Sequence, residues 1–454
     1  MVVAQWLERP AVNGKVGGSN PLSHPREEMC YNQRGKNMTK IKPQALKGFR
    51  DFLPEEMVIR QKVINTLKEV FASYGFEPLE TPALEYAETL LGKSGEETEK
   101  LVYSFEDKGG RKVGLRYDLT VPVSRVLAQY RDKISLPFKR YQVQTVWRAE
   151  KPQKGRYREI TQCDIDSFGS ASPLADAEII AIIYNGLKKL GFEEFVIKIN
   201  SRQVLFELMK GVGIAENKQL AVIRSLDKLE KTNPGEVLSE LKQLGLTEEK
   251  IKKLFSLIEK VQPDENLKQL FNYLEWLEVS KDFYQFDPIL ARGLDYYTGP
   301  IFEAVVEEPK IGSIVGGGRY DNLIADLGGP NIPATGVSFG LDRICDVIRE
   351  QNLWPELSPT YTKILVSIFS PEYLENSIAI ANKLRAESIA TELYLDPEKK
   401  LDKQLKYADK KGIPFVIIIG PEEVKKGTIT LKNMKTGAQE NLSLEGVTKK
   451  IGVS

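Results

Sequence analysis

Residues 140–169 read RYQVQTVWRAEKPQKGRYREITQCDIDSFG, and this stretch decides the fold expected for the chain. Two runs of alternating polar and apolar residues flank KPQKGR at 151–156, a segment rich in turn-forming and basic residues. Alternation is typical of β-strands, and two such runs joined by a short polar segment predict a hairpin. We therefore expect an antiparallel hairpin that belongs to a sheet.

One face of this hairpin is dense in charged and amide side chains. Residues two apart share a face of a strand. The return strand thus presents Arg158, Ile160, Gln162, Asp164 and Asp166 on one side, and the outgoing strand presents Gln142, Gln144, Arg148 and Glu150. This face is either a solvated sheet surface or the floor of a cleft for a zwitterion and a polyphosphate. Lys151, Lys154 and Arg156 would form a basic loop suited to phosphates or an RNA end.

Composition limits the chemistry further. The 454 residues carry 64 Lys and Arg against 63 Asp and Glu, and the net charge of +1 excludes a polybasic coat. Cys30, Cys163 and Cys345 are too few and too scattered for a zinc ribbon or a disulfide framework. The single histidine, His24, lies in the N-terminal segment, so histidine catalysis is excluded from the body of the chain. No stretch approaches the roughly 20 apolar residues that span a bilayer. The few scattered cysteines fit a reducing compartment, so we expect a cytoplasmic protein.

Three more segments combine glycine with charged or aromatic residues. ARGLDYYTGPIFEAV at 291–305 sets an arginine and a tyrosine pair between glycines. GGGRYD at 316–321 fits a turn as well as a ligand site. GVSFGLDRI at 336–344 predicts a strand that enters a helix, with Arg343 in the first helical turn.

Together these segments resemble the motifs of class II aminoacyl-tRNA synthetases, specifically the histidyl-tRNA synthetase family. The hairpin is similar to motif 2 and GVSFGLDRI to motif 3. The helix from Met57 followed by GFEPLETPALE is similar to motif 1, with Pro82 at the dimer-interface position. RGLDYYTGPIFE and GGGRYDNLI are similar to the two signatures of the histidyl enzymes. The resemblance covers about Lys40 to the C-terminus. It implies a homodimer that activates L-histidine with ATP and transfers it to tRNA(His).

The resemblance also implies roles for individual residues. The histidine site would comprise Asp118, Leu119, Thr120, Arg148, Gln162, Asp166, Arg292, Tyr296 and Tyr297. The ATP site would comprise Arg148, Glu150, Arg156, Ile160 and Arg343, with Mg²⁺ arriving on ATP and no side chain assigned to the metal. Arg148 and Arg292 would be catalytic, since guanidiniums beside the α-phosphate stabilise the charge that develops there. Ile160 departs from the family, which usually places an aromatic ring beneath adenine, so we expect weaker ATP binding.

The expected fold class is α+β, a class II synthetase core whose antiparallel sheet is flanked by helices. The expected parts are a disordered extension (1–37), a core in two pieces (38–201 and 286–357), a helical insertion (202–285) and an α/β anticodon-binding domain (358–454). The extension resembles a translation read through a tRNA gene, so we expect synthesis to start at Met38 or Met29.

Hydrophobic periodicity predicts particular elements. We expect helices over 56–74 and 173–190, a helix opened by Thr247, strands between 113 and 168, and strands at 301–306 and 312–315. Alternating strands and helices over 364–419 predict a mostly parallel sheet.

Three alternatives compete with an active enzyme of this family. A regulatory paralogue that has lost catalysis would tend to lack the signature arginine and the C-terminal module, whereas Arg292 and residues 363–454 are present. RGLDYY argues against a class II enzyme for another amino acid. A pure RNA-binding module leaves the arginines at 148, 292 and 343 unexplained.

Overall fold

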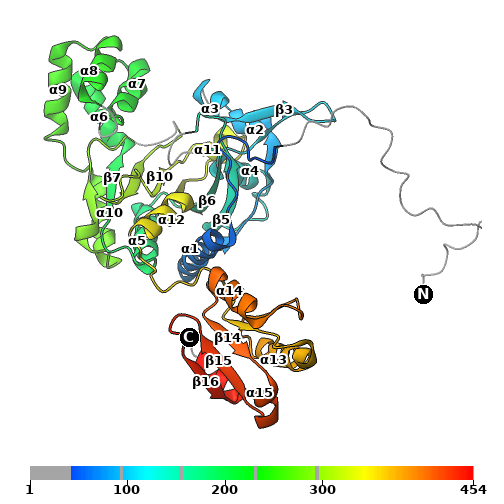
Figure 1. The fold of residues 1–454 in the computed structure, drawn as a ribbon. Coiled ribbons are helices and arrows are strands. Elements are labelled where there is room, and N and C mark those ends of the chain that lie inside the picture. Colours follow the sequence, from blue (N-terminus) through cyan, green and yellow to red (C-terminus); the bar gives the residue numbers. More distant parts are fainter. Residues whose placement is uncertain (1–41, 93–95, 153–156, 230–232, 292–295, 453–454) are drawn as a thin grey trace, which may run out of the picture. The chain divides into compact units, whose positions relative to one another are not determined.

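The central element of the computed structural model is an eight-stranded sheet with the order β1-β5-β6-β11-β10-β9-β7-β8 (Figure 1). The structure describes residues 42–92, 96–152, 157–229, 233–291 and 296–452. The strands are β1 (Glu77–Pro78), β5 (Phe138–Trp147), β6 (Glu159–Phe168), β7 (Val196–Ser201), β8 (Tyr284–Phe286), β9 (Pro300–Val305), β10 (Val315–Arg319) and β11 (Ala334–Gly340). Only the outermost pairs, β1/β5 and β7/β8, are parallel among these strands. The predicted α+β class with an antiparallel core sheet is confirmed.

The hairpin predicted from residues 140–169 forms as β5 and β6. The two strands pair antiparallel over ten residues each, with Gln142 opposite Asp164 and Gln144 opposite Gln162. β6 also pairs with β11, so the polar face of the hairpin lies inside the sheet and not at its edge.

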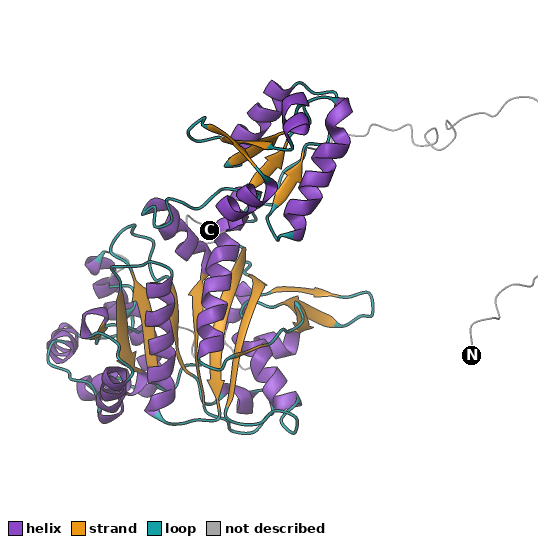
Figure 2. Cartoon of the chain, turned by 90° about the horizontal axis from the view of Figure 1, so that it is seen from below, coloured by secondary structure: helices purple, strands orange, loops and turns teal. Residues whose placement is uncertain are grey.

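Long helices cover one face of this sheet (Figure 2). They are α1 (Pro54–Ser73), α5 (Pro173–Lys189), α12 (Leu341–Glu350) and α10 (Glu265–Trp276), and α10 packs on α5. Cys163 and Ile165 of β6 belong to the buried core on this side, and Phe71 of α1 packs on Phe339 of β11 with ring centroids 5.5 Å apart. The alternation along β6 therefore sends its apolar residues to the core and its polar residues to the opposite face.

One element between 113 and 168 differs from the prediction of strands alone. A helix, α4 (Thr120–Gln129), interrupts the strands, and its first turn is fixed by the Asp118 carboxylate, which accepts a hydrogen bond of 3.1 Å from the Val121 amide. This capping overrides the β-propensity of the valines around it. A second, small sheet has the order β2-β4-β3, with β2 at Leu84–Tyr86, β4 at Lys112–Leu115 and β3 at Tyr103–Glu106. Two short helices, α2 (Ala87–Leu91) and α3 (Glu96–Leu101), lie between β2 and β3 in the sequence.

The segment from 202 onward is helical, as its periodicity predicts. Its helices are α6 (Arg202–Val212), α7 (Glu216–Leu226), α8 (Pro234–Gln243) and α9 (Glu248–Ile258), followed by α10 and the short η1 (Lys281–Phe283). The Thr247 hydroxyl accepts a hydrogen bond from the Lys250 amide and caps α9. Because α10 packs on α5 of the core layer, the helices that stand apart from the core sheet are α6 to α9.

The C-terminal module has its own five-stranded sheet with the order β13-β12-β14-β15-β16. Its elements are β12 (Ile364–Val366), η2 (Pro371–Tyr373), α13 (Leu374–Ala386), β13 (Thr391–Leu393), α14 (Leu401–Lys411), β14 (Phe415–Ile418), α15 (Pro421–Lys426), β15 (Ile429–Asn433), β16 (Gln439–Leu442) and α16 (Leu444–Gly452). The three strands expected from the sequence pair in parallel, whereas β15 and β16 add an antiparallel hairpin that the pattern did not predict.

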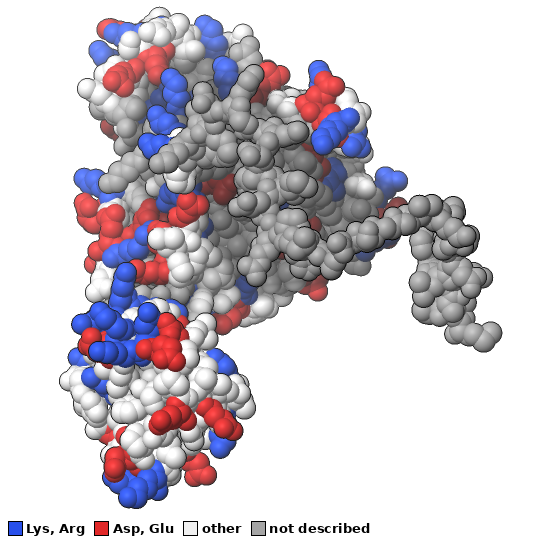
Figure 3. Space-filling model, turned by 45° about the vertical axis from the view of Figure 1, so that its right-hand side comes forward, with Lys and Arg blue, Asp and Glu red and all other residues white. Residues whose placement is uncertain are grey.

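Charge is interspersed over the visible surface, with Lys and Arg beside Asp and Glu (Figure 3). This distribution agrees with a net charge of +1. Across the described residues, no helix combines the length and apolar character needed to cross a membrane.

Candidate active site

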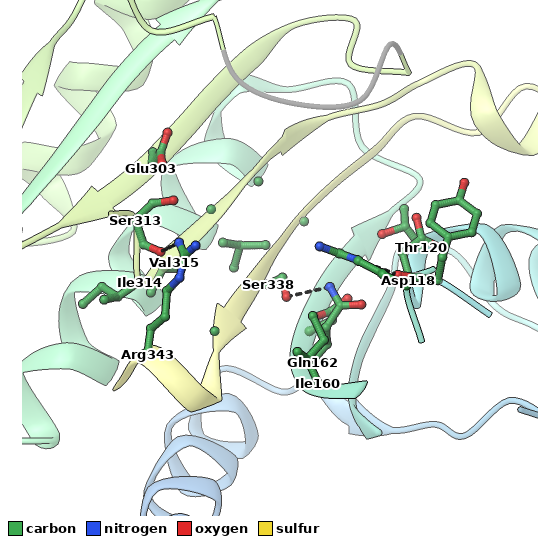
Figure 4. A pocket seen from close by; sticks show the side chains of 18 of the residues that line it. Asp118, Thr120, Ile160, Gln162, Glu303, Ser313, Ile314, Val315, Ser338 and Arg343 are labelled. Carbon is green, nitrogen blue, oxygen red and sulfur yellow. Dashed lines mark hydrogen bonds between the residues drawn. The ribbon is translucent and has the colours of Figure 1, made fainter. Parts of the chain in front are cut away.

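A cavity of about 690 Å³ lies on the polar face of the central sheet (Figure 4). Its lining includes ten of the residues predicted to bind histidine or ATP, namely Asp118, Thr120, Arg148, Glu150, Ile160, Gln162, Asp166, Tyr296, Tyr297 and Arg343. These residues come from the loop before α4, from both strands of the hairpin, from the segment before β9 and from α12. Of the two interpretations of the polar hairpin face, the cleft floor is therefore the one that the structure supports.

Glycines in β10 and β11 make room for the floor of this cavity. A Cβ atom at Gly336 would stand 2.0 Å from Oδ1 of Asp166, and one at Gly317 would stand 2.0 Å from the Gly336 carbonyl oxygen. The glycine run at 316–318 therefore belongs to a buried strand and not to a turn, which moves the strand expected at 312–315 to Val315–Arg319. Glycine is needed here because backbone and carboxylate approach closely.

Three buried aspartates surround the inner end of the cavity. Asp118, Asp164 and Asp166 are each about 3% exposed. Burial raises the pKa of Asp118 to about 6 and that of Asp164 to about 7, because the charged carboxylate loses its hydration. The pKa of Asp166 is also raised by burial, although the Arg140 guanidinium 2.5 Å away opposes the shift. Arg140 is itself fully buried and holds the Asp166 carboxylate in place.

Several acceptor atoms at this end have no hydrogen-bond partner among the described residues. They are Oδ2 of Asp118, Oε1 of Gln162 and Oδ1 of Asp164. A buried acceptor without a donor costs about 1–3 kcal/mol. Converging acceptors and a surplus of negative charge suit a ligand that carries several N–H donors, such as an ammonium group.

Aromatic side chains form the adjoining wall. The rings of Tyr296 and Tyr297 have centroids 4.8 Å apart, and Tyr320 meets Tyr296 edge-on at 5.8 Å. The Tyr320 hydroxyl donates a hydrogen bond to the Asp166 carboxylate. Burial raises the pKa of Tyr296 well above its usual value, so its hydroxyl stays protonated and can donate.

Two arginines of the predicted ATP site, Arg148 and Arg343, line the cavity. Nε of Arg148 donates to the Tyr117 carbonyl at 3.1 Å, and Nη1 of Arg343 donates to the Ser313 carbonyl at 2.6 Å. Figure 4 shows Arg343 alongside Ser313 and Ile314. Each guanidinium is thus anchored on the backbone, which pre-orients it for planar recognition of phosphate oxygens.

Four predicted residues are not brought into this cavity by the described structure. The Leu119 side chain is fully buried outside the lining, because Leu119 starts α4 and points into the core. Arg156 and Arg292 lie outside the described residues. Pro82 is exposed between β1 and β2, away from the lining.

Sequence reasoning missed some lining residues. Tyr320, Ser338 and Glu303 line the cavity but were not assigned a ligand. Asp164 was placed on the correct face but left out of the histidine site. The signal for Ser338 and Tyr320 was available in principle, since each lies within a glycine-rich segment that flanks the floor.

Comparisons with known proteins match this geometry. A family model described as histidyl-tRNA synthetase matches residues 48–344, and an anticodon binding domain model matches 363–453. The histidine–tRNA ligase of Clostridium tetani is 41% identical over 434 residues, covering 90% of this chain and 98% of that protein. The histidine–tRNA ligase of Cytophaga hutchinsonii is 39% identical over 452 residues, covering 90% and 99%.

Comparisons with solved structures point to the same family. Histidyl-tRNA synthetase from Nostoc sp. PCC 7120 superposes with a TM-score of 0.80 and 28% identity, covering 91% of this chain and 100% of that chain. A Bacillus halodurans protein described as an ATP phosphoribosyltransferase regulatory subunit/histidyl-tRNA synthetase gives 0.67 at 25% identity, covering 82% and 97%. The core sheet, the hairpin and the cavity thus define a class II aminoacyl-tRNA synthetase. Within that class, the chain belongs to the histidyl-tRNA synthetase family.

Proposed function

We propose that this chain is a histidine–tRNA ligase. It activates L-histidine with ATP to histidyl-adenylate and pyrophosphate, then transfers the histidine to the 3′ end of tRNA(His). The observation that carries the proposal is the cavity on β6, whose acidic inner end and arginine-bearing outer part suit an amino acid and a nucleotide side by side.

The amino acid would bind at the acidic end. Asp118, Thr120 and Gln162 would receive the ammonium group, which is supported by their place in the cavity lining and by the unsatisfied oxygens of Asp118 and Gln162. Tyr296 and Tyr297 would contact the imidazole, whose two nitrogens need one donor and one acceptor. Asp166, held by Arg140 and Tyr320, would add a fixed acceptor beside them.

ATP would bind toward the arginines. Ile160 offers an apolar floor for adenine, while Glu150 and Arg156 would flank the nucleotide. Arg343 would contact the outer phosphates. The substrate carboxylate would attack the α-phosphorus in line and expel pyrophosphate. Arg148 and Arg292 would stabilise the charge on the equatorial oxygens.

Mg²⁺ would accompany ATP. Glu150 and Glu303 line the cavity and offer carboxylate oxygens, the ligands that Mg²⁺ prefers beside substrate phosphates. When bound, the ion would supply positive charge to the phosphates.

The module at 363–453 would read the tRNA anticodon, and the protein would act as a cytoplasmic homodimer. Pro82 would lie in the dimer interface, and the exposed Leu84, Tyr86 and Phe105 of the small sheet support an apolar contact there. Light scattering would test the dimer. A chain ending at Thr362 should keep pyrophosphate exchange and lose tRNA charging, because the module has its own core.

Amino-acid-dependent ATP–pyrophosphate exchange with all twenty amino acids tests the function, with Arg292→Ala as the matched variant. Exchange with histidine alone, reduced about 10²–10³-fold in the variant, is the expected result. No exchange with any amino acid from a folded protein would point to a regulatory paralogue. Exchange with another amino acid would show that the pocket has been misassigned.

A further inference from the structure

Asp164 is a pocket residue that the proposed function leaves unused. It lies on β6 between Gln162 and Asp166, lines the cavity and is 3% exposed. On β11 its direct partner in the ladder is Ser338, so the two side chains share the cavity face of the sheet. The Ser338 hydroxyl therefore lies beside the Asp164 carboxylate, where it lowers the pKa of that group.

Ser338 links Asp164 to Gln162. Nε2 of Gln162 donates to Oγ of Ser338 at 3.0 Å, as the dashed line in Figure 4 shows. A serine has a single hydroxyl hydrogen, and two acceptors, the Asp164 carboxylate and Oε1 of Gln162, could compete for it. A charged acceptor forms the stronger bond, so the hydrogen goes to Asp164. The serine oxygen is then left as an acceptor, which draws the amide nitrogen of Gln162 toward it.

This arrangement decides which end of the Gln162 amide the ligand meets. Oε1 of Gln162 is buried and has no hydrogen-bond partner among the described residues, and the same holds for Oδ1 of Asp164. If the amide were reversed, its NH₂ group would face the ammonium of the substrate and repel it. The orientation of Gln162 therefore matters for amino acid binding.

We propose that Asp164 is a positioning residue for the amino acid substrate. Acting through Ser338, it turns Oε1 of Gln162 toward the ammonium group. The inference rests on the proposed function, because it takes histidine as the ligand of this end of the cavity.

The charged groups around Asp164 predict that histidine binding also releases a proton from this carboxyl group. Arg140 faces it from β5, Asp166 from its own strand, Asp118 from the segment before α4, and Ser338 from β11. Burial is the largest influence and raises the pKa of Asp164 to about 7, while Asp118 and Asp166 raise it further and Arg140 lowers it. An arriving ammonium adds positive charge and favours the ionised carboxylate. Histidine affinity should therefore increase as the pH rises toward and past 7.

The test is the KM for histidine in pyrophosphate exchange between pH 6 and 8.5, for the wild type, Asp164→Asn and Ser338→Ala. Free histidine itself titrates in this range, so the informative quantity is the ratio of variant to wild-type KM at each pH. Asp164→Asn keeps an acceptor for Ser338 but loses the charge. The ratio of its histidine KM to that of the wild type should be about ten at pH 8. This ratio should approach one at pH 6, because the Asp164 carboxylate of the wild type takes up one proton over this range.

Ser338→Ala keeps the carboxylate and breaks the link to Gln162. Its histidine KM should be about fivefold to tenfold that of the wild type at every pH, as expected for the loss of one hydrogen bond of about 1 kcal/mol. In both variants kcat and the ATP KM should stay within about twofold of wild type, which separates positioning from general damage.

A pH-independent ratio for Asp164→Asn would overturn the proton coupling, and an unchanged histidine KM in Ser338→Ala would overturn the positioning role. Should Asp164→Asn fail to fold, Ser338→Ala still decides, since it removes one oxygen from a half-buried position. If the wild type shows no exchange with histidine, the proposed function itself is refuted. If the wild type uses histidine but one of the two variants gives the contradicting result, only this inference is refuted.

Discussion

The floor of the candidate active-site cavity and the sheet of the C-terminal module are built from the same kind of element in opposite ways. In the module, β12 and β14 bury Ile364, Val366 and Ile417 against helices, and the interior is apolar. In the cavity floor, β6 presents Asp164 and Asp166, which are nearly as well buried. One sheet face is stabilised by apolar burial and the other carries buried charge.

The two regions differ in the interactions on which their stability depends, and this difference separates residues needed for folding from residues needed for activity. Apolar burial contributes roughly 25 cal/mol per Å² and needs no directional partner. The cavity floor depends instead on geometry, because buried carboxylates persist only beside partners such as Arg140 and in the space left by glycines. Matched substitutions in the two regions should therefore have unequal effects on activity.

The largest effect should come from an arginine pair with identical anchoring. Nε of Arg148 in the cavity and Nε of Arg385 in the module each donate to a backbone carbonyl at 3.1 Å. Arg148→Ala should lower the pyrophosphate exchange rate about 10²–10³-fold, because a donor to the transition state is lost. Arg385→Ala should leave this tRNA-independent rate unchanged. Equal rates for the two variants would contradict the assignment of Arg148.

A glycine pair should give the next largest effect. Alanine at Gly336 would place Cβ 2.0 Å from the Asp166 carboxylate and 2.7 Å from the Ile165 carbonyl, so the floor must shift. A displacement on the order of 1 Å near reacting groups costs about 10²-fold in rate. Gly437, with φ of +75° and no atom within 4 Å, is the control. Gly437→Ala should cost about 1 kcal/mol of stability with no change in exchange. Wild-type exchange in Gly336→Ala would show that the floor is not rigid.

The smallest effect should come from an isoleucine pair. Ile160→Phe places a ring in the open cavity and should lower the ATP KM about fivefold, since base stacking contributes about 1 kcal/mol or more. Ile417 is fully buried in the module. Ile417→Phe should leave the ATP KM unchanged and destabilise the fold by about 1–3 kcal/mol through overpacking, measured by urea unfolding. An unchanged ATP KM in Ile160→Phe would refute the expected benefit of stacking.

The sequence predicted the elements whose signal is local. The alternation of β5 and β6, the cap at Thr247 and the strand entering a helix at Gly340 all depend on neighbouring residues, and the structure has them as expected. Ile160, Gln162 and Asp166 share one face of β6 as this alternation predicts, whereas the roles of the candidate site residues came from the family resemblance.

The remaining features depend on contacts between distant segments. The glycine run at 316–318 becomes a strand through pairing with β11 and β9, whose Gly336 and Pro300 carbonyl oxygens would stand 2.0 and 2.6 Å from a Cβ at Gly317 and Gly318. The link from Asp164 through Ser338 to Gln162 needs the register between β6 and β11, which no local pattern encodes. The antiparallel β15/β16 hairpin likewise depends on pairing with β14.

The pairing of β6 with β11 has a consequence for the synthesis of the chain on the ribosome. Gln162 and Ser338 touch although 176 residues separate them, and β11 ends only at Gly340, after about three quarters of the 454 residues. Pairings of such long sequence separation form late in folding. A nascent chain that stalls earlier therefore carries the hairpin without its partner strand. A fragment released before β11 is made therefore lacks part of the cavity lining, including Ser338.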